Sequence, residues 1–383
     1  MNRREYINYF ILLLAFIMAG CNTCNKKKGT AAQPDKIQIG CISVFSGDGA
    51  NYGTTAKTAV EMAVNEINAA GGVQGKKIEI IYEDDKGETK DAVTAFQKLA
   101  SVNKVPAVIG PFYSGQVLAC APQADRSKVV LISGSATSDN ISKSGEFVFR
   151  TCPTNLEQGK TIAQFCYNDL KKKNAFIIYR NADYGVTLKD RFKSEYEKLG
   201  GVVTGETAIE PDAKDAKSQL NKIKQAKADL LFIPVHYPEG GILLKQAKEM
   251  GIKAIFIGGD GGYDPQLIEI AGNGADNSYW ATIGWGSSDT KVLTDSFIAK
   301  YKKLYNIEPG VYSGLYYDAV KVLAEAIGKC DINKLSGEAI KSALMNIKNY
   351  RGATGTLTFN ADGDVEKPFS IYKISNKQFQ IIK

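Results

Sequence analysis

Residues 105–139 constrain the fold of this chain more than any other stretch. They contain two short apolar runs, 107–109 and 129–132, and each run leads directly into a loop of glycine and hydroxyl residues. Buried parallel strands are continuous apolar runs of this kind, because helices cover both of their faces. Ligands of an open α/β sheet bind outside the carboxyl ends of such strands. We therefore expect the loops 110–115 and 133–138, which carry hydroxyl and backbone N–H groups and no basic side chain, to receive a small carboxylate.

Strands and helices alternate along the rest of the chain. The sequence predicts strands at 36–43, 78–82, 106–110, 129–133, 147–150, 175–179, 202–207, 229–235, 254–257, 355–359 and 369–375. It predicts helices at 54–70, 89–101, 116–125, 156–170, 186–199, 213–227, 240–250, 265–271, 289–305, 312–330 and 336–347. Such alternation is typical of doubly wound parallel sheets. Because the pattern begins again after the strand at 147–150, we predict an α/β fold of two doubly wound, Rossmann-like lobes.

The N-terminal residues predict that the protein is exported from the cytoplasm. Two arginines, an apolar run and two small residues precede Cys21, as in a secretory signal peptide that is too short to span a bilayer. The run 18–21, Met-Ala-Gly-Cys, resembles a bacterial lipobox, in which the thiol is lipidated. We predict a signal peptide at 1–20 and a lipidated, flexible tether at 21–35, so that the body is extracytoplasmic and meets the membrane only through its lipid anchor. The alternative is a plain secreted protein with an incidental cysteine.

Composition and motifs argue against several functions. The formal net charge is +7, but much of it lies in the leader and in three consecutive lysines at 26–28, so nothing favours a nucleic-acid partner. His236 is the only histidine, and no G-x-S-x-G elbow, P-loop or paired C-x-x-C motif occurs in the body. The cysteines after Cys21 are widely spaced and predict no disulfide connectivity. Residues 360–364 resemble a calcium loop only faintly, and turn chemistry is favoured there. We predict no enzyme, no cofactor and no metal.

Polar loops also follow strands of the second half. Tyr184 follows the strand at 175–179, and His236 follows the strand at 229–235. Asp260 stands among glycines directly after the next apolar strand, where its carboxylate could receive an ammonium group. Each residue alone could be an ordinary loop or capping residue. Together with the loops of the first half, they predict a ligand site formed by both lobes.

The number and order of these motifs resemble type I periplasmic binding proteins that feed branched-chain amino-acid ABC importers. The matching runs are 46–53, 65–75, 109–115, 132–137, 183–185, 236–241 and 257–261. The resemblance covers about 36–383 and implies a two-lobed clamp whose three crossovers lie near 152–155, 283–284 and 360–364. The implied lobes are 36–152 with 284–359, and 153–283 with 360–383.

The resemblance also implies which residues contact the ligand. The expected set is Tyr52, Tyr113, Ser114, Ser135, Ala136, Thr137, Tyr184, His236 and Asp260. Ser114 and Thr137 match positions that bind the α-carboxylate of an amino acid. Tyr52 and Tyr184 match aromatic residues that flank its side chain, and Tyr113 lies beside Ser114.

Some positions depart from the family pattern. Ser135, with Ala136 beside it, falls where the family binds the ammonium with a backbone carbonyl. Asp260 stands where the family usually has glutamate, and His236 stands where tyrosine is common. These differences could suit a polar or bulkier amino acid. Trp285 follows the second crossover, and we expect it at the mouth of the cleft.

The resemblance implies an extracytoplasmic solute-binding lipoprotein of an ABC importer. We expect it to bind an amino acid, above all the branched-chain Leu, Ile or Val, and to deliver it to the permease subunits by hinge-type closure of the lobes. A ligand-binding sensor on the same fold and a binder of an amide, urea or an aromatic acid stay open as alternatives. A secreted hydrolase is a third alternative, but the sequence contains no motif that supports it.

Overall fold

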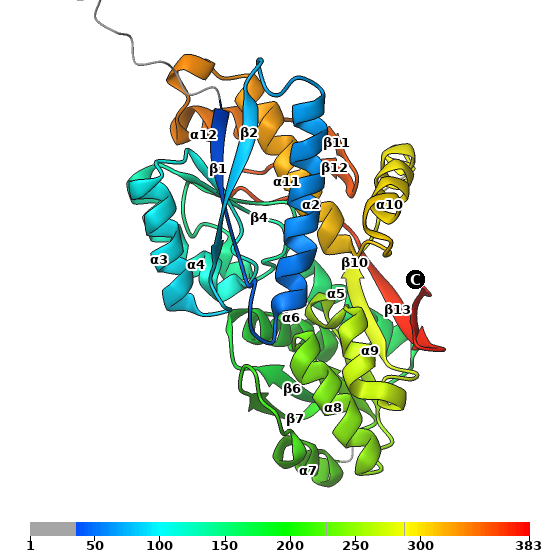
Figure 1. Ribbon diagram of the computed structural model, residues 1–383. Helices are drawn as coiled ribbons and strands as arrows, with labels where there is room; N and C mark the ends of the chain where they lie inside the picture. The colour runs from blue at the N-terminus through cyan, green and yellow to red at the C-terminus, as the bar shows by residue number, and fades with distance from the viewer. Residues whose placement is uncertain (1–35, 227, 287) are drawn as a thin grey trace, which may run out of the picture. The chain divides into compact units, whose positions relative to one another are not determined.

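The computed structural model describes residues 36–226, 228–286 and 288–383. The predicted signal peptide, Cys21 and the tether lie outside these residues. The described chain forms two larger sheets and one two-stranded sheet, with helices packed against them (Figure 1). No helix within the described ranges is long and apolar enough to cross a membrane.

The first sheet has five parallel strands in the order β2-β1-β3-β4-β5. They are β1 (Lys36–Ser43), β2 (Lys77–Asp84), β3 (Ala107–Ile109), β4 (Val130–Ser133) and β5 (Val148–Arg150). Every residue of β3 and β4 is buried, as their continuous apolar runs predict.

Four helices cover the faces of this sheet. α2 (Ala50–Ala69) and α11 (Val311–Gly328) pack together on one side, and α3 (Thr89–Gln97) and α4 (Ser114–Ser127) lie on the other side (Figure 1). α10 (Lys291–Tyr305) and α12 (Gly337–Asn346) complete what we call the five-stranded half, together with β11 (Tyr350–Gly352) and β12 (Gly355–Leu357).

The second sheet has seven strands in the order β14-β13-β10-β9-β8-β6-β7. They are β6 (Asn174–Arg180), β7 (Val202–Ile209), β8 (Leu230–Ile233), β9 (Ile255–Gly258), β10 (Tyr279–Ile283), β13 (Phe369–Ser375) and β14 (Gln378–Ile381). The strands β7, β6, β8, β9 and β10 run parallel, and β13 and β14 continue the sheet antiparallel. This sheet and its helices form the seven-stranded half.

Successive residues of the central strand β8 belong to two different apolar clusters, one on each face of the second sheet. Leu230 and Phe232 of β8 join the apolar cluster of α5 (Asn155–Gln164) and α6 (Asp183–Lys198). Leu231 and Ile233 join the larger cluster that contains α7 (Lys217–Ala226), α8 (Tyr237–Glu249) and α9 (Pro265–Ala271). Successive side chains of a strand point to opposite faces, so both faces of this central strand are buried.

The chain crosses between the two halves three times. It leaves the five-stranded half after β5, returns after β10, and leaves it again between β12 and β13. We call the segment between Arg150 and Asn155 the first crossover, the segment that follows Ile283 the second, and the segment between Leu357 and Phe369 the third. In the third crossover, the side chain of Asn360 accepts hydrogen bonds from the N–H groups of Asp362 and Asp364, which is the turn that the sequence favours over a calcium loop.

Helix starts differ from the sequence-based boundaries. α2, α4, α6 and α8 begin two to four residues earlier than predicted, at Ala50, Ser114, Asp183 and Tyr237. Their first turns hold glycine and aromatic residues, which have weak helix propensity, and tertiary packing overrides that propensity. Residues expected in loops, such as Tyr52 and Tyr184, are therefore fixed in first helical turns.

The sequence pattern also fails to predict β10, β11 and β14. Each is short, and β10 holds Ala and Thr between its larger residues. Its place is determined by partners that are distant in sequence, since it pairs with β9 and β13. Trp280 of β10 is completely buried against Gly258 and Gly262.

We expect Gly258→Ala to destabilise the protein. A Cβ atom at Gly258 would lie 2.0 Å from Cζ3 of Trp280, so the buried ring would have to shift. Overpacking of this kind costs about 1–3 kcal/mol. The free energy of unfolding, measured in urea, should fall by that amount, whereas Gly310→Ala should change it little because open space surrounds Gly310. Equal stability of the two variants would contradict the packing described for Trp280.

Candidate functional site

An aromatic cluster joins the two halves. Its members lie at or next to the starts of α2, α4, α6, α8 and α11, and they are Tyr52, Phe112, Tyr113, Tyr184, His236, Tyr237 and Tyr312. The ring of Tyr113 stacks on His236 with centroids 4.6 Å apart, and His236 stacks on Tyr184 at 5.0 Å. His236 is thus held between one tyrosine from each half. The structure brings together four of the aromatic residues expected at the site.

Hydrogen bonds connect the halves at the same place. The hydroxyl of Tyr52 donates to the carbonyl of Gly261 and accepts from the N–H of Tyr237 at 3.1 Å. Beside it, the amide of Asn51 donates to both carboxylate oxygens of Asp264, at 2.9 and 2.8 Å. The first turn of α2 is therefore bonded directly to the loops of the seven-stranded half.

Asp260 is a buried carboxylate at this interface. It follows β9 in a 3₁₀ turn, Asp260–Gly262, and its side chain is completely buried. Burial raises the pKa of Asp260, and nearby polar groups of Gln158, Tyr312 and Tyr184 oppose that rise in part. Tyr312 donates to Oδ2 at 2.9 Å, but Oδ1 has no hydrogen-bond partner within the described chain. A cation that reached Oδ1 would relieve the cost of this buried charge.

The opposite half supplies groups that suit an anion. Ser114 is the first residue of α4, and its Oγ accepts a hydrogen bond of 3.3 Å from the N–H of Ser138. Thr137 is completely buried, and its Oγ1 has no partner among the described residues. The first turn of an α-helix has backbone N–H groups without intrahelical partners and carries a partial positive charge. Ser114, Thr137 and the start of α4 together can bind a carboxylate.

Ser135 and Ala136 bind groups of the protein itself. The hydroxyl of Ser135 donates to the carbonyl of Phe112 at 2.7 Å and lies 3.0 Å from the hydroxyl of Tyr316. The carbonyl of Ala136 accepts from Nη1 of Arg150 at 3.1 Å and from Sγ of Cys152 at 3.4 Å. These contacts fix the shape of the loop that carries Thr137.

A buried ion pair lies beside His236. Arg180, at the end of β6, is paired with Glu239 in the first turn of α8, and its guanidinium carbon lies 5.6 Å from the ring centre of Tyr113. Burial and the charge of Arg180 lower the pKa of His236 well below its usual value, so the imidazole is neutral at pH 7. Its Nδ1 is buried without a partner in the described chain.

The sequence did not predict several of these residues. Phe112 and Tyr237 are direct neighbours of predicted residues, and attention to aromatic residues in the same loops would have found them. Tyr312 and Gln158 lie on helices far from Asp260 in sequence, and no local pattern marks them. Trp285, expected at the mouth of the cleft, packs against Phe297 and Gly314.

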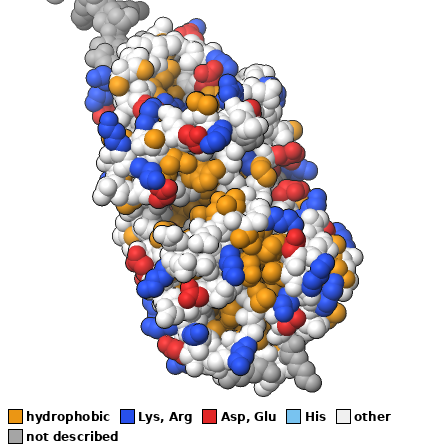
Figure 2. Space-filling model, turned by 90° about the vertical axis from the view of Figure 1, so that its right-hand side faces the viewer, with side chains coloured by type: hydrophobic (Ala, Val, Ile, Leu, Met, Phe, Trp, Pro, Cys, Tyr) orange, Lys and Arg blue, Asp and Glu red, His pale blue; other side chains and the backbone are white. Residues whose placement is uncertain are grey.

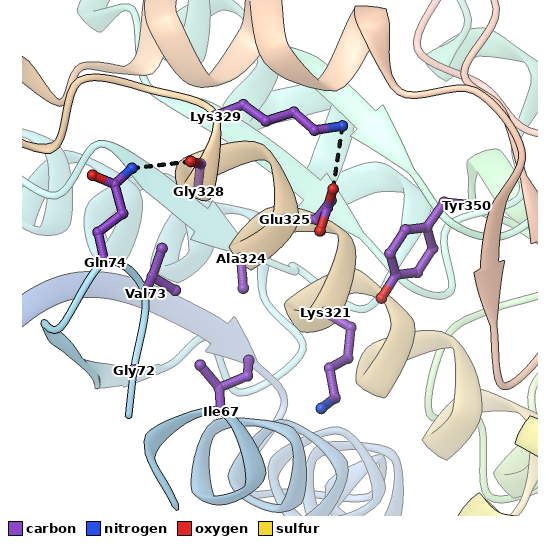
Figure 3. Close-up of a pocket in the computed structure, with 10 residues that line it drawn as sticks. All are labelled: Ile67, Gly72, Val73, Gln74, Lys321, Ala324, Glu325, Gly328, Lys329 and Tyr350. Atoms are coloured by element: carbon purple, nitrogen blue, oxygen red, sulfur yellow. Dashed lines mark hydrogen bonds and ion pairs between the residues drawn. The ribbon is translucent and has the colours of Figure 1, made fainter. Parts of the chain in front are cut away.

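A separate pocket of about 430 Å³ lies between the α2–β2 connection and the end of α11 (Figure 3). Its charged groups have partners within the protein, because Lys329 pairs with Glu325 and Lys321 with Glu66. Gln74 closes one side by donating to the carbonyl of Gly328 (Figure 3). None of the expected site residues lines this pocket. No group of side chains that could hold a metal ion occurs within the described residues.

Residues 36–378 match the family described as periplasmic binding protein. The chain belongs to this family. A relative from Rhizobium johnstonii, the Leu/Ile/Val-binding protein BraC3, is 31% identical over 341 residues, which cover 88% of this chain and 91% of the relative. The family consists of solute-binding proteins that work outside the cytoplasm.

Solved structures agree with this membership. The branched-chain amino-acid transporter substrate-binding protein LivJ from Streptococcus pneumoniae, in complex with isoleucine, aligns with a TM-score of 0.84 and 30% identity over 91% of this chain and 99% of that one. The leucine-binding protein LivK from Thermotoga maritima aligns with a TM-score of 0.83 and 26% identity over 91% and 98%. The predicted fold class and the resemblance to branched-chain amino-acid binding proteins are confirmed.

Asp260→Asn should stabilise the protein without ligand at neutral pH. The pKa of Asp260 is raised in the folded state, so the folded protein holds this proton more tightly than the unfolded chain. The cost of the carboxylate is thus present above the folded-state pKa and disappears as the pH falls below about 3.9, the usual value. Thermal unfolding should show a gain of about 1–3 kcal/mol at pH 7 that vanishes toward pH 4. A variant less stable than the wild type at pH 7 would contradict the uncompensated burial of this charge.

Proposed function

We propose that this protein is the solute-binding lipoprotein of an ABC importer and that it binds a branched-chain amino acid between its two halves. One observation carries the ligand proposal. Each half holds a completely buried polar atom without a partner among the described residues, Oγ1 of Thr137 in the five-stranded half and Oδ1 of Asp260 in the seven-stranded half. A zwitterion supplies the carboxylate and the ammonium that these two atoms would bind.

The charges of an amino acid match the two sides of the site. Its ammonium would form a charge-assisted hydrogen bond with Asp260, a stronger bond than one between neutral groups. Its carboxylate would receive hydrogen bonds from Ser114 and Thr137 at the positive end of α4. A ligand that contacts both halves binds their closed arrangement better than an open one, and it therefore shifts the population toward closure.

Aromatic side chains would surround the ligand's own side chain. Tyr52, Tyr113 and Tyr184 offer ring faces, and His236 is neutral because burial and Arg180 lower its pKa. Apolar ring faces favour an aliphatic side chain, which loses its contact with water on binding. The names of the relatives support this choice: BraC3 is named for Leu, Ile and Val, and the LivJ structure contains isoleucine.

Transport requires more than ligand binding. We propose that the lobes are 36–152 with 284–359 and 153–283 with 360–383, and that they close about the three crossovers. The closed form would then be the one that the permease subunits of the importer recognise. A lipid on Cys21 would hold the protein at the membrane surface beside that permease.

Titration calorimetry with single amino acids tests the ligand. The wild-type protein should bind Leu, Ile or Val at micromolar or lower concentration. Asp260→Asn should weaken binding by about 2–5 kcal/mol, which is roughly 30-fold or more, because the buried ammonium loses its charged partner. Asp276→Asn, an equal change of charge at an exposed position of the same half, should leave the affinity unchanged. Unchanged binding by Asp260→Asn would remove this residue from the site.

Binding tests with further ligands distinguish an error in the proposed ligand class from an error in the family assignment. If the wild-type protein binds an amide, urea or an aromatic acid but no amino acid, the proposed ligand class is wrong and membership of the family is unaffected. Binding of an amino acid without any transport by the neighbouring permease would instead favour a sensor.

Lipidation is tested with Cys21→Ser. In bacterial cells fed labelled palmitate, the wild-type protein should carry the label and sediment with membranes. Cys21→Ser should carry no label and leave the membrane fraction, because it lacks the thiol that the lipid modifies. Cys24→Ser, three residues away, should behave like the wild type. Label on the Cys21→Ser protein would overturn the proposed anchor.

A further inference from the structure

Arg150 is a buried charged residue outside the ligand contacts described above. It is the last residue of β5, directly before the first crossover, and its side chain is completely buried. Its N–H donates to the carbonyl of Gly363 in the third crossover at 3.0 Å. Arg150 therefore lies where the first and third crossovers meet.

The guanidinium of Arg150 holds two carbonyls of the loop that carries Thr137. Nη1 donates to the carbonyl of Ala136 at 3.1 Å and to that of Ser138 at 2.8 Å. These two carbonyls flank Thr137, and the carbonyl of Thr137 itself accepts from the N–H of Asn155, the first residue of α5, at 2.7 Å. Three successive peptide groups are thus fixed, two by Arg150 and the one between them by the seven-stranded half.

The rest of the guanidinium is bound to the third crossover and to the end of the same loop. Nε donates to Oδ1 of Asp364 at 2.6 Å, and Nη2 donates to Oγ of Ser142 at 2.8 Å. The hydroxyl of Ser142 in turn donates to Oδ2 of Asp364 at 2.6 Å. Arg150, Asp364 and Ser142 close a ring of hydrogen bonds in which the buried cation has a charged partner, as a buried charge requires.

We propose that Arg150 is a positioning residue for ligand binding: it fixes the segment Ala136–Ser138 so that the Oγ1 atom and the backbone of Thr137 meet the ligand carboxylate. This inference rests on the proposed function, because it concerns the same site. In this proposal Arg150 contacts the loop and not the ligand. It acts through the loop, which it ties to the third crossover through Asp364.

The expected effect follows from the population of the correct loop conformation. Without the planar fork of Arg150, the carbonyls of Ala136 and Ser138 each lose their charged donor, and the loop gains alternative conformations. Apparent affinity falls in proportion to the fraction of molecules in the competent conformation. If that fraction drops to about one tenth, the Kd rises about tenfold.

Arg150→Lys is the direct test. Lysine keeps the positive charge for Asp364 but is a compact cation that cannot reproduce the fixed fork of donors. We expect the Kd for the amino acid to rise at least about tenfold. Amide hydrogen exchange, measured without ligand, should become faster in residues 134–138 and stay unchanged in the distant strand β9. Ser142→Ala removes two of the three bonds of the ring but leaves the bonds of Arg150 to the loop carbonyls, so it should cause a smaller change in the same direction, about two- to threefold.

Lys367→Met is the matched control for lost stability. Lys367 is also buried in the third crossover, but its Nζ donates to the carbonyl and the hydroxyl of Thr354, both at 2.8 Å, and not to the loop. This variant should lower the melting temperature while the Kd changes by less than about twofold. A Kd increase in Lys367→Met equal to that of Arg150→Lys would show that Arg150 has only a structural role, and would overturn the proposal.

Two further outcomes are decisive. Unchanged Kd and unchanged exchange in both Ser142→Ala and a folded Arg150→Lys overturn the proposal; if Arg150→Lys does not fold, Ser142→Ala alone decides in the same way. A wild-type protein that binds no amino acid overturns the proposed function instead. Hydrogen exchange is measured without ligand. Even in that case it supports or overturns the claim that Arg150 fixes the conformation of the loop.

Discussion

The two halves of this protein meet around a carboxylate that the fold itself does not neutralise. Asp260 is completely buried, and within the described residues the one hydrogen bond of good geometry to its side chain comes from Tyr312 of the other half. Closing the halves therefore removes a charge from water without supplying a cation, and an uncompensated buried charge costs free energy. Contacts between the halves, such as that of Asn51 with Asp264, favour closure. A bound ammonium would remove the free-energy cost of burying the Asp260 carboxylate, which opposes closure. In the proposed function, closure and ligand binding are thereby coupled through one charge.

The surrounding residues keep further charge away from that carboxylate. Tyrosine supplies a broad apolar face and a single hydroxyl, so a cluster of tyrosines can line the site and still make bonds such as that of Tyr52 to Gly261. His236 could have brought a positive charge that competes with an ammonium, but burial and Arg180 lower its pKa and keep it neutral. The charge of Arg180 is in turn paired with Glu239. Asp260 is therefore left as the acceptor for a cation.

Local sequence patterns predict the parts of this site that adjoin strand ends, and they fail where contacts are distant in sequence. Short apolar runs followed by hydroxyl, glycine or acidic residues were enough to predict β3, β4 and β9 and to place Ser114, Thr137 and Asp260 shortly after the ends of these strands, although Ser114 begins a helix where a loop was expected. Tyr312 lies 52 residues from Asp260, and Arg150 lies 214 residues from Asp364. The segments 110–115 and 133–138 contain no basic residue, but in the structure the guanidinium of Arg150 donates hydrogen bonds to two carbonyls of the loop after β4. No periodicity encodes such a pairing.

The loop after β4 is hydrogen-bonded to segments beside two of the three crossovers. Its Thr137 carbonyl and the carboxylate of Asp139 accept hydrogen bonds from the N–H groups of Asn155 and Leu156, at the start of α5. Both donors lie just beyond the first crossover, and Arg150 ties the same loop to the third crossover. Rotation of the seven-stranded half about these crossovers must therefore strain or break bonds of the segment that carries Thr137. In the proposed function, the peptide groups that place Thr137 against the ligand carboxylate are therefore also those that a rotation of the halves would displace.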